Sequence, residues 1–355
     1  MQIDNQEVLS RLNPKKILWP VLIGLSVAAF LFFRGFDKEA FSQITWSWQS
    51  TFWLCMAVLS VVIRDFAYMI RIRVLTENHL SWYRSFIVIM LWEFSSALAP
   101  TLIGGGFLFA IYILSREGIN MGKSITVITV SNFLDGIFLA IMAPLVYFIV
   151  GKSTLFSGLS VDTSLLGSSV FYTFWIIFWA ILVLKSFIGY ALFFNPQVAK
   201  KVIQSIFSIA FLKRWQGGAK ETAEQLIIAS KELRTKTKGY WVWSVITTFI
   251  TWTARFSIVN CIIHAFHGTT ALDDIAMYGK QIVVQFIGFA SPTPGASGVS
   301  EAMFETIFSD YILPGLSATL GVLWRLISYY PYLIIGAFIL PKWIKEKIIE
   351  TRSKS

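Results

Sequence analysis

The sequence predicts an all-α, multi-pass membrane protein with about six full transmembrane helices and two broken re-entrant hairpins. Hydrophobic residues make up 55% of the 355 residues and charged residues 14%, whereas soluble domains contain about 45–50% apolar and about 25% charged residues. The apolar residues also gather in long runs, and proline and glycine interrupt two of these runs in the middle. This composition excludes a disordered chain and an ordinary water-soluble enzyme.

Six apolar runs are long enough to cross a bilayer as helices, which takes about 20 mostly apolar residues. The first run follows a hydrophilic segment and precedes no small-residue cleavage site, so we expect an uncleaved helix and not a removed signal peptide. The six predicted spans are 17–33, 52–70, 124–150, 170–194, 240–266 and 316–340.

Two further apolar stretches, 85–115 and 281–313, are interrupted by residues that break helices. Proline removes a helical hydrogen bond and glycine weakens a helix, so the pieces on either side are too short to cross the bilayer alone. We predict that both stretches are re-entrant hairpins. The interruptions contain Pro100, Gly104 and Gly105 in the first stretch, and Pro292, Pro294, Gly295 and Gly298 in the second.

The basic residues favour hairpins over continuous spans, because Lys and Arg gather on the cytoplasmic side of membrane proteins. With two hairpins, 22 of the 30 Lys and Arg lie on one side, Arg71 among them, and 4 lie on the other, Lys280 among them. We therefore predict a protein of the cell (inner, cytoplasmic) membrane with both termini in the cytoplasm. The net charge of +10 then reports topology, and its scattered distribution does not indicate nucleic-acid binding.

The order of elements is span, span, hairpin, span, and this order occurs twice in opposite orientation. The first membrane half covers 1–168, and the second covers 169–355 and includes a cytoplasmic linker at 195–238. Broken helices that enter from opposite faces should meet near the midplane, where non-helical backbone must be buried in protein or line a cavity. This pattern is typical of inverted-repeat transporters.

Several ionisable residues fall inside the predicted membrane segments, where a central charge costs about 2.5–3.5 kcal/mol on insertion scales. They pair with one another, as Arg325 would with Glu301 or Asp135, or contact a substrate, and the two roles do not exclude each other. Arginine forks and half-helix N-termini both suit an anionic headgroup, although Glu301 has the alternative of capping its own half-helix. The candidate substrate-binding residues are Arg64, Asp135, Arg255, Glu301 and Arg325, with the prolines and glycines of both interruptions. Lys185 is expected to extend its amine to the interface.

The remaining residue types give no sign of a metal or a cofactor. Cys55 and Cys261 both lie in apolar runs, and the three histidines lack metal-binding spacing, so we expect neither a disulfide framework nor a metal site. No phosphate-binding glycine motif follows a predicted strand, and we therefore expect no nucleotide cofactor.

Four stretches resemble the transmembrane region of lysylphosphatidylglycerol synthases, a flippase-like, UPF0104-like family. The most specific is the Pro-Thr-Pro-Gly run at 292–295 with Gly298 and Glu301. The others are 64–75, 99–106 and 132–136, and Arg325, Tyr329, Tyr330, Pro331 and Gly336 follow the most specific stretch. The resemblance implies a translocator of lipid or lipid-linked substrate between leaflets. The first hairpin departs from the family pattern, because apolar residues replace an acid and an arginine after its glycines.

Bifunctional members of that family carry a soluble aminoacyl transferase domain, for which the residues after 340 leave no room, so we expect no aminoacyl transfer. The first hypothesis is a lipid flippase or secondary transporter that is not an enzyme. An alternative is a membrane enzyme or accessory subunit of lipid modification, with Glu301 or Asp135 as acid or base, and a third is a structural membrane protein. A membrane lipid is the expected partner, while a homo-oligomer and a lipid-modifying enzyme partner both stay open.

Overall fold

The computed structural model describes residues 46–99, 106–158, 164–195 and 230–352, with Phe33 and a few positions between 197 and 228. Within these residues the chain forms eleven α-helices, one short 3-10 helix and no strand, which confirms the predicted all-α class. Three groups of predictions lie outside the described residues: the span at 17–33 apart from Phe33, most of the linker, and Pro100, Gly104 and Gly105.

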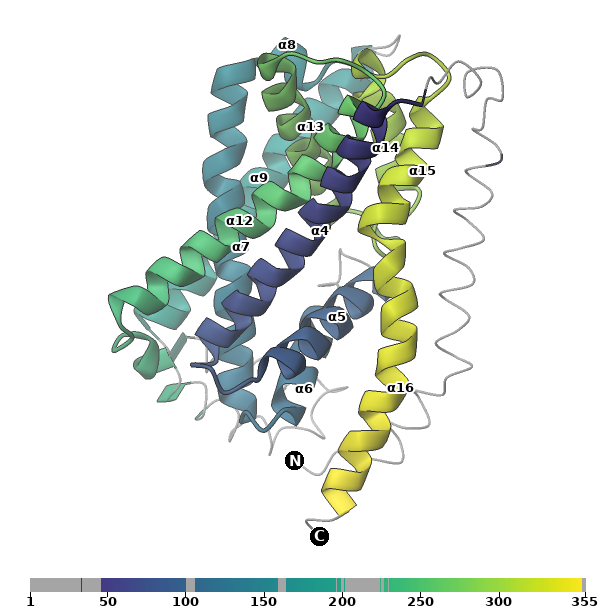
Figure 1. The fold of residues 1–355 in the computed structure, drawn as a ribbon. Coiled ribbons are helices and arrows are strands. Elements are labelled where there is room, and N and C mark those ends of the chain that lie inside the picture. Colours follow the sequence, from purple (N-terminus) through teal and green to yellow (C-terminus); the bar gives the residue numbers. More distant parts are fainter. Residues whose placement is uncertain are drawn as a thin grey trace.

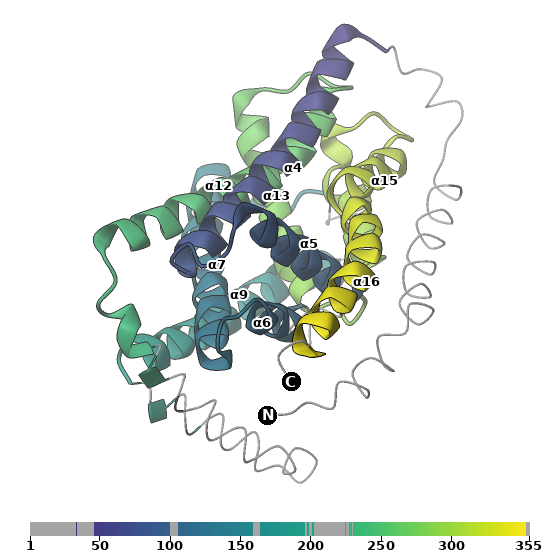
Figure 2. The same cartoon turned by 60° about the horizontal axis from the view of Figure 1, so that its bottom comes forward.

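Five spans in the described part of the chain are long and apolar enough to cross a membrane, as predicted. They are formed by α4 (Trp48–Leu75), α7 (Met121–Val150), α9 (Ser164–Phe193), α12 (Lys238–His264) and the pair α15 (Ser317–Ser328) and α16 (Tyr330–Arg352). Helices α4 and α12 pack along each other over much of their length, and α16 lies beside α5 in both views (Figures 1 and 2). Each span is as long as the sequence predicts or longer.

Two pairs of shorter helices enter the bundle from opposite ends (Figure 1). Helices α5 (Trp82–Leu98) and α6 (Phe107–Arg116) have 17 and 10 residues, and α13 (Ala271–Phe289) and α14 (Val299–Ile307) have 19 and 9. At a rise of about 1.5 Å per residue, none of the four reaches across a hydrocarbon core of about 30 Å. Both pairs lie where the sequence predicts hairpins.

The second pair begins ten residues earlier than the predicted hairpin at 281–313. Thr270 caps α13 in a capping box with Asp273, whose amide N donates to Thr270 Oγ1 over 3.3 Å. The first turns of α13 carry Asp273, Asp274 and Lys280, so this part of the helix is too polar to be detected as an apolar run. The cap residue, and not hydropathy, fixes the start of this helix.

The predicted span at 316–340 is divided at Tyr329, which the sequence analysis did not anticipate. Tyr329 leaves the helical conformation with φ −129° and ψ −55° and ends α15, and α16 starts at the next residue. Pro331 explains the break, because proline has no amide hydrogen to donate to the carbonyl four residues earlier, that of Ile327, and its ring clashes with that carbonyl. Proline then fits the first turn of the new helix α16.

Two cations assigned to membrane flanks are in fact buried. The Arg71 side chain is 1% exposed and bonds Asp135 on α7, so it lies inside the bundle. Lys280 is 0% exposed, and its amine donates to the Ile307 carbonyl and to Ser157 Oγ, each over 2.7 Å. These two residues therefore do not contribute to the charge difference between the two membrane surfaces.

A charge cluster beyond the end of α4 predicts a pH effect on stability. Glu77 receives hydrogen bonds from Lys236 and Lys123, at 2.7 and 2.9 Å, and these bonds hold the pKa of Glu77 below its ordinary value of 4.5. A lowered pKa stabilises the folded state above pH 4.5, and this contribution is lost as the pH falls through the lowered value. Because the Glu77 side chain is 44% exposed, we expect solvent screening to limit it to about 0.2–1 kcal/mol.

The measurement is the pH dependence of thermal unfolding of the Glu77→Gln variant in detergent. We expect the variant to be less stable than the parent at neutral pH and equal to it near pH 3. Glu232→Gln, at an exposed carboxylate of the described residues, serves as the control. An equal difference between Glu77→Gln and the parent at both pH values would contradict the assignment.

Candidate functional site

The described edges of the two helix breaks touch each other inside the bundle. The Gly295 amide approaches the Ala99 carbonyl at 3.5 Å, which links the second break directly to the end of α5. Tyr329 Oη donates to the Ala97 carbonyl over 3.0 Å and lies 3.4 Å from Ser297 Oγ. The break in the last span therefore supplies the side chain that connects both hairpins.

The backbone of the second break requires the glycines that its sequence contains. Gly295 has φ +55°, and a Cβ placed on it would lie 2.4 Å from the ring of Tyr329. Gly298 has φ +83° and begins α14, where its amide donates to Glu301 Oε2 over 2.6 Å. A residue with a side chain would strain both positions, and at Gly295 it would also displace the tyrosine that connects the hairpins.

Arg325 on α15 holds this break in place. Its Nε donates to Glu301 Oε1 over 2.8 Å, and its Nη2 donates to the Gly295 carbonyl over 3.2 Å. The guanidinium also lies over the ring of Tyr329, 4.6 Å from the ring centroid. Glu301 therefore has both of the roles that the sequence suggests: one carboxylate oxygen pairs with Arg325, and the other caps α14.

A cavity of about 560 Å³ lies beside the meeting point of the hairpins. Five of the candidate substrate-binding residues line it: Arg64, Asp135, Arg255, Gly295 and Arg325. Glu301 lies behind Arg325 as its ion-pair partner, whereas Pro292, Pro294 and Gly298 belong to the break without lining the cavity. The structure thus brings together the charges of five different helices that the sequence analysis could only propose one by one.

One wall of the cavity carries an ion pair between neighbouring residues of α4. Arg64 Nη2 and Nε lie 3.0 and 3.1 Å from Asp65 Oδ1. Tyr332 on α16 donates its hydroxyl to Asp65 Oδ2 over 2.7 Å, and Arg64 stacks over the Tyr332 ring at 4.7 Å. Tyr332 on the last span therefore contacts both members of this ion pair and links α16 to α4.

Asp135 on α7 is the centre of the opposite wall. Arg71 donates to both of its oxygens, at 2.5 and 3.4 Å, and Trp252 Nε1 donates to Oδ1 over 2.8 Å. Arg71 also donates to Thr248 Oγ1 over 3.1 Å. Three helices, α4, α7 and α12, therefore meet at one carboxylate.

Two cations on the cavity wall have weaker partners. Arg255 Nη2 approaches Glu93 Oε2 at 3.5 Å, the outer limit of a hydrogen bond. Lys185 on α9 does not extend to the interface as expected, because its amine turns into the bundle and donates to the Asn132 carbonyl over 2.9 Å. Its methylene stem packs against Gly136, where a Cβ would lie 2.8 Å from Lys185 Cγ.

Sequence reasoning missed several residues of this cavity, and helical periodicity could have found part of them. Arg64, Tyr68 and Arg71 are spaced at i, i+4 and i+7, which places them on one face of α4. Asn132, Asp135 and Gly136 are spaced at i, i+3 and i+4 and so share one face of α7. The missed lining residues are Tyr68, Asn132, Lys185, Trp252, Gln281 and Tyr332, and the missed ion-pair partners of lining residues are Asp65 and Arg71.

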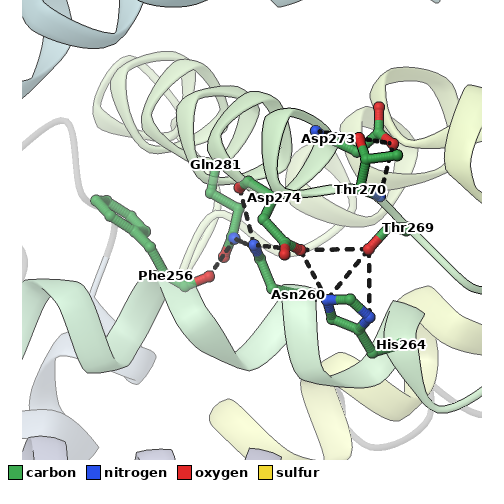
Figure 3. A network of polar contacts seen from close by, with 8 residues as sticks. All are labelled: Phe256, Asn260, His264, Thr269, Thr270, Asp273, Asp274 and Gln281. Carbon is green, nitrogen blue, oxygen red and sulfur yellow. Dashed lines mark hydrogen bonds and ion pairs between the residues drawn. The ribbon is translucent and has the colours of Figure 1, made fainter.

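A chain of polar side chains leads from the cavity to the end of α12 (Figure 3). Gln281, which lines the cavity, donates to the Phe256 carbonyl and to Asn260 Oδ1, the latter over 3.3 Å. Asn260 donates to the Asp274 carbonyl over 2.8 Å, and Asp274 Oδ1 lies 2.7 Å from His264 Nε2. These contacts fix α13 against α12 and so position the second hairpin. Among the described residues no group of three potential ligands could hold a metal ion.

Comparison with known proteins identifies relatives over nearly the whole chain. The family model described as "Lysylphosphatidylglycerol synthase TM region" matches residues 17–336. A "UPF0104 membrane protein" of Archaeoglobus fulgidus is 24% identical over 347 residues, which cover 94% of this chain and 98% of the relative. No solved structure matches the chain. The family match covers all of the cavity-lining residues described above.

Proposed function

Because the chain belongs to the lysylphosphatidylglycerol synthase transmembrane-region family, we propose that it moves a lipid between the two leaflets of the cell membrane. The cargo is an anionic or modified phospholipid, or a lipid-linked substrate. The protein acts as a flippase or secondary transporter and not as an enzyme. The membrane location follows from the five apolar spans of the described residues.

The observation that carries this proposal is a cavity with both a charged and an apolar wall. Arg64, Arg255 and Lys185 supply cations, while Leu139, Ile181 and Leu184 supply apolar surface next to Lys185. A phospholipid has the same division, with a charged headgroup attached to apolar chains. A small soluble anion would gain nothing from the apolar wall, because the hydrophobic effect scales with the apolar area removed from water.

The junction of the two hairpins supports alternating access to this cavity. The contact between Gly295 and Ala99 is long, at 3.5 Å, and Tyr329 contributes one further bond at 3.0 Å. In the part of the chain that the structure describes, which excludes residues 100–105, the polar contacts named at this junction are these two. Movement of either hairpin away from this junction would open the cavity toward one side of the membrane, as in transporters with opposed broken helices.

The direct test is lipid movement in liposomes that contain the purified protein. Phosphatidylglycerol with a fluorophore on an acyl chain is placed in both leaflets, and a membrane-impermeant reductant quenches the outer leaflet. We expect most of the inner pool to become quenched within minutes, whereas protein-free liposomes retain about half of the signal. A retained half-signal for phosphatidylglycerol and for a panel of amino-modified lipids would contradict the proposal.

Lipid mass spectrometry of a deletion strain separates a transporter from a lipid-modifying enzyme. A transporter changes the distribution of a lipid between leaflets, so we expect the set of lipid species to be unchanged. A lipid species that is missing in the deletion strain and returns with the parent gene would favour the enzyme.

The proposed orientation places both termini in the cytoplasm, and cysteine labelling tests it. Ser153 and Gln197 are exposed and lie near opposite ends of α9. In a Cys55→Ser, Cys261→Ser background, we expect an impermeant maleimide to label Ser153→Cys in intact cells and Gln197→Cys only after permeabilisation. The reverse result would invert the topology, and equal labelling of both would contradict a span between them.

A further inference from the structure

The charges around the cavity do not cancel. Three cations have close carboxylate partners in the described part of the chain: Arg64 with Asp65, Arg71 with Asp135, and Arg325 with Glu301, at 3.0, 2.5 and 2.8 Å. The fourth carboxylate, Glu93, faces Arg255. Lys185 forms no ion pair among the described residues and donates to a main-chain carbonyl. Five cations thus meet four carboxylates.

Lys185 and Arg255 both line the cavity. Trp252 Nε1 donates to Asp135, and the Arg255 guanidinium lies 5.3 Å from the centroid of the Trp252 ring. The bonds that Asp135 accepts come from Arg71 and Trp252, whereas the Lys185 amine donates to the Asn132 carbonyl. Lys185 and Arg255 are accordingly the two cavity cations with the weakest carboxylate contacts: Lys185 forms no ion pair among the described residues, and Arg255 reaches Glu93 only at 3.5 Å.

From this arrangement we infer that Lys185 and Arg255 form an anion subsite selective for a lipid headgroup with one net negative charge, such as a phosphodiester. This inference rests on the proposed lipid transport and names the substrate class of the same cavity. A buried charge is costly unless it is paired, and a monoanion leaves the cavity neutral. A phosphomonoester, with about 1.5 to 2 negative charges at neutral pH, leaves it negative, and a zwitterion leaves it positive.

Binding to the purified full chain in a neutral detergent tests the subsite without any transport step. The ligands are dihexanoyl forms of phosphatidylglycerol, phosphatidic acid and phosphatidylcholine, titrated at neutral pH in a calorimeter. We expect phosphatidylglycerol to bind about tenfold more tightly than either of the others. Equal affinity for the three lipids, or tighter binding of phosphatidic acid, would overturn the inference.

Variants of Lys185 assign the selectivity to this residue. Lys185→Met keeps the stem that packs against Gly136 but removes the charge, so we expect it to bind phosphatidylglycerol only as weakly as phosphatidylcholine. Lys185→Arg should retain the tenfold preference. Lys152→Met, which removes an exposed lysine outside the cavity, is the matched control and should match the parent. An undiminished preference in Lys185→Met would overturn the assignment.

A second variant changes the preference in the opposite direction. Glu93→Gln removes one carboxylate and leaves two positive charges in excess, so we expect phosphatidic acid to gain about tenfold relative to phosphatidylglycerol. A purely structural role of Glu93 would weaken both ligands equally. Such equal weakening in a folded Glu93→Gln variant would count against the charge balance as the source of selectivity.

Two soluble ligands separate failure of the subsite from failure of lipid transport. Glycerophosphoglycerol has the diester headgroup without acyl chains, and inorganic phosphate has neither. We expect both to bind far more weakly than dihexanoyl phosphatidylglycerol. If glycerophosphoglycerol binds equally tightly and loses affinity in Lys185→Met, the monoanion subsite stands and the proposed lipid cargo is wrong.

Discussion

Replacing Arg71 by methionine is expected to lower the free energy of unfolding by about 3–5 kcal/mol, the range observed when one partner of a buried ion pair is removed. Arg71 is 1% exposed and donates to both oxygens of Asp135. Without it, Asp135 keeps the Trp252 bond but loses the direct ion-pair partner that it has among the described residues. The measurement is unfolding in mixed micelles with increasing denaturing detergent, followed by tryptophan fluorescence.

A double variant separates the ion pair from packing. Asp135→Asn removes the charge that Arg71→Met leaves behind, and the asparagine oxygen can still accept the Trp252 hydrogen bond. We expect Arg71→Met with Asp135→Asn to recover most of the lost stability. As a control, Arg73→Met removes a partly buried arginine that bonds the Leu80 carbonyl and should cost less. Unfolding of Arg71→Met at the parent's midpoint would contradict the burial of this pair.

Arg71 also shows which part of the site the sequence could have predicted. Its spacing from Arg64 and Tyr68 places all three residues on one helical face. A predicted helix that continued beyond residue 70 would therefore have placed Arg71 inside the bundle and not at the membrane flank. Sequence reasoning ended the span at residue 70, before the arginines that follow. The polar cap at Ser47 and the end at Leu75 extend the helix beyond its apolar core.

Other features are accessible from sequence for clear physical reasons. Long apolar runs predict the spans because a bilayer core requires about 20 apolar residues, and the residues at 292–298 predict a break because several prolines and glycines in one short stretch strongly disfavour a helix. The break at Tyr329 could have been predicted from Pro331 by the same rule. These properties depend on local sequence only.

The direction of Lys185 could not be predicted from sequence. Helix α9 is apolar on every side, so no polar stripe indicates which face turns toward the bundle. A lysine near a helix end can reach either the interface or the interior with its flexible stem. Only the packing of α9 against α7, where Gly136 leaves room for the stem, selects the interior.

Replacing Arg325 by leucine is expected to reduce lipid movement in liposomes at least tenfold. Arg325 holds the second break through Glu301 and the Gly295 carbonyl, and it stacks on the tyrosine that contacts Ala97. Leucine fills similar space but provides none of these contacts, so the tips of both hairpins lose their common support. Quenching of labelled phosphatidylglycerol measures the rate.

Stability must be separated from transport in this experiment, because Arg325→Leu also leaves Glu301 without its partner. In the double variant with Glu301→Gln, the glutamine oxygen can still accept the Gly298 amide and cap α14, while no charge remains unpaired. We therefore expect the double variant to unfold close to the parent's midpoint and yet to move lipid as slowly as Arg325→Leu. If the double variant regains both stability and transport, Arg325 only supports the fold, and transport through the cavity does not need it.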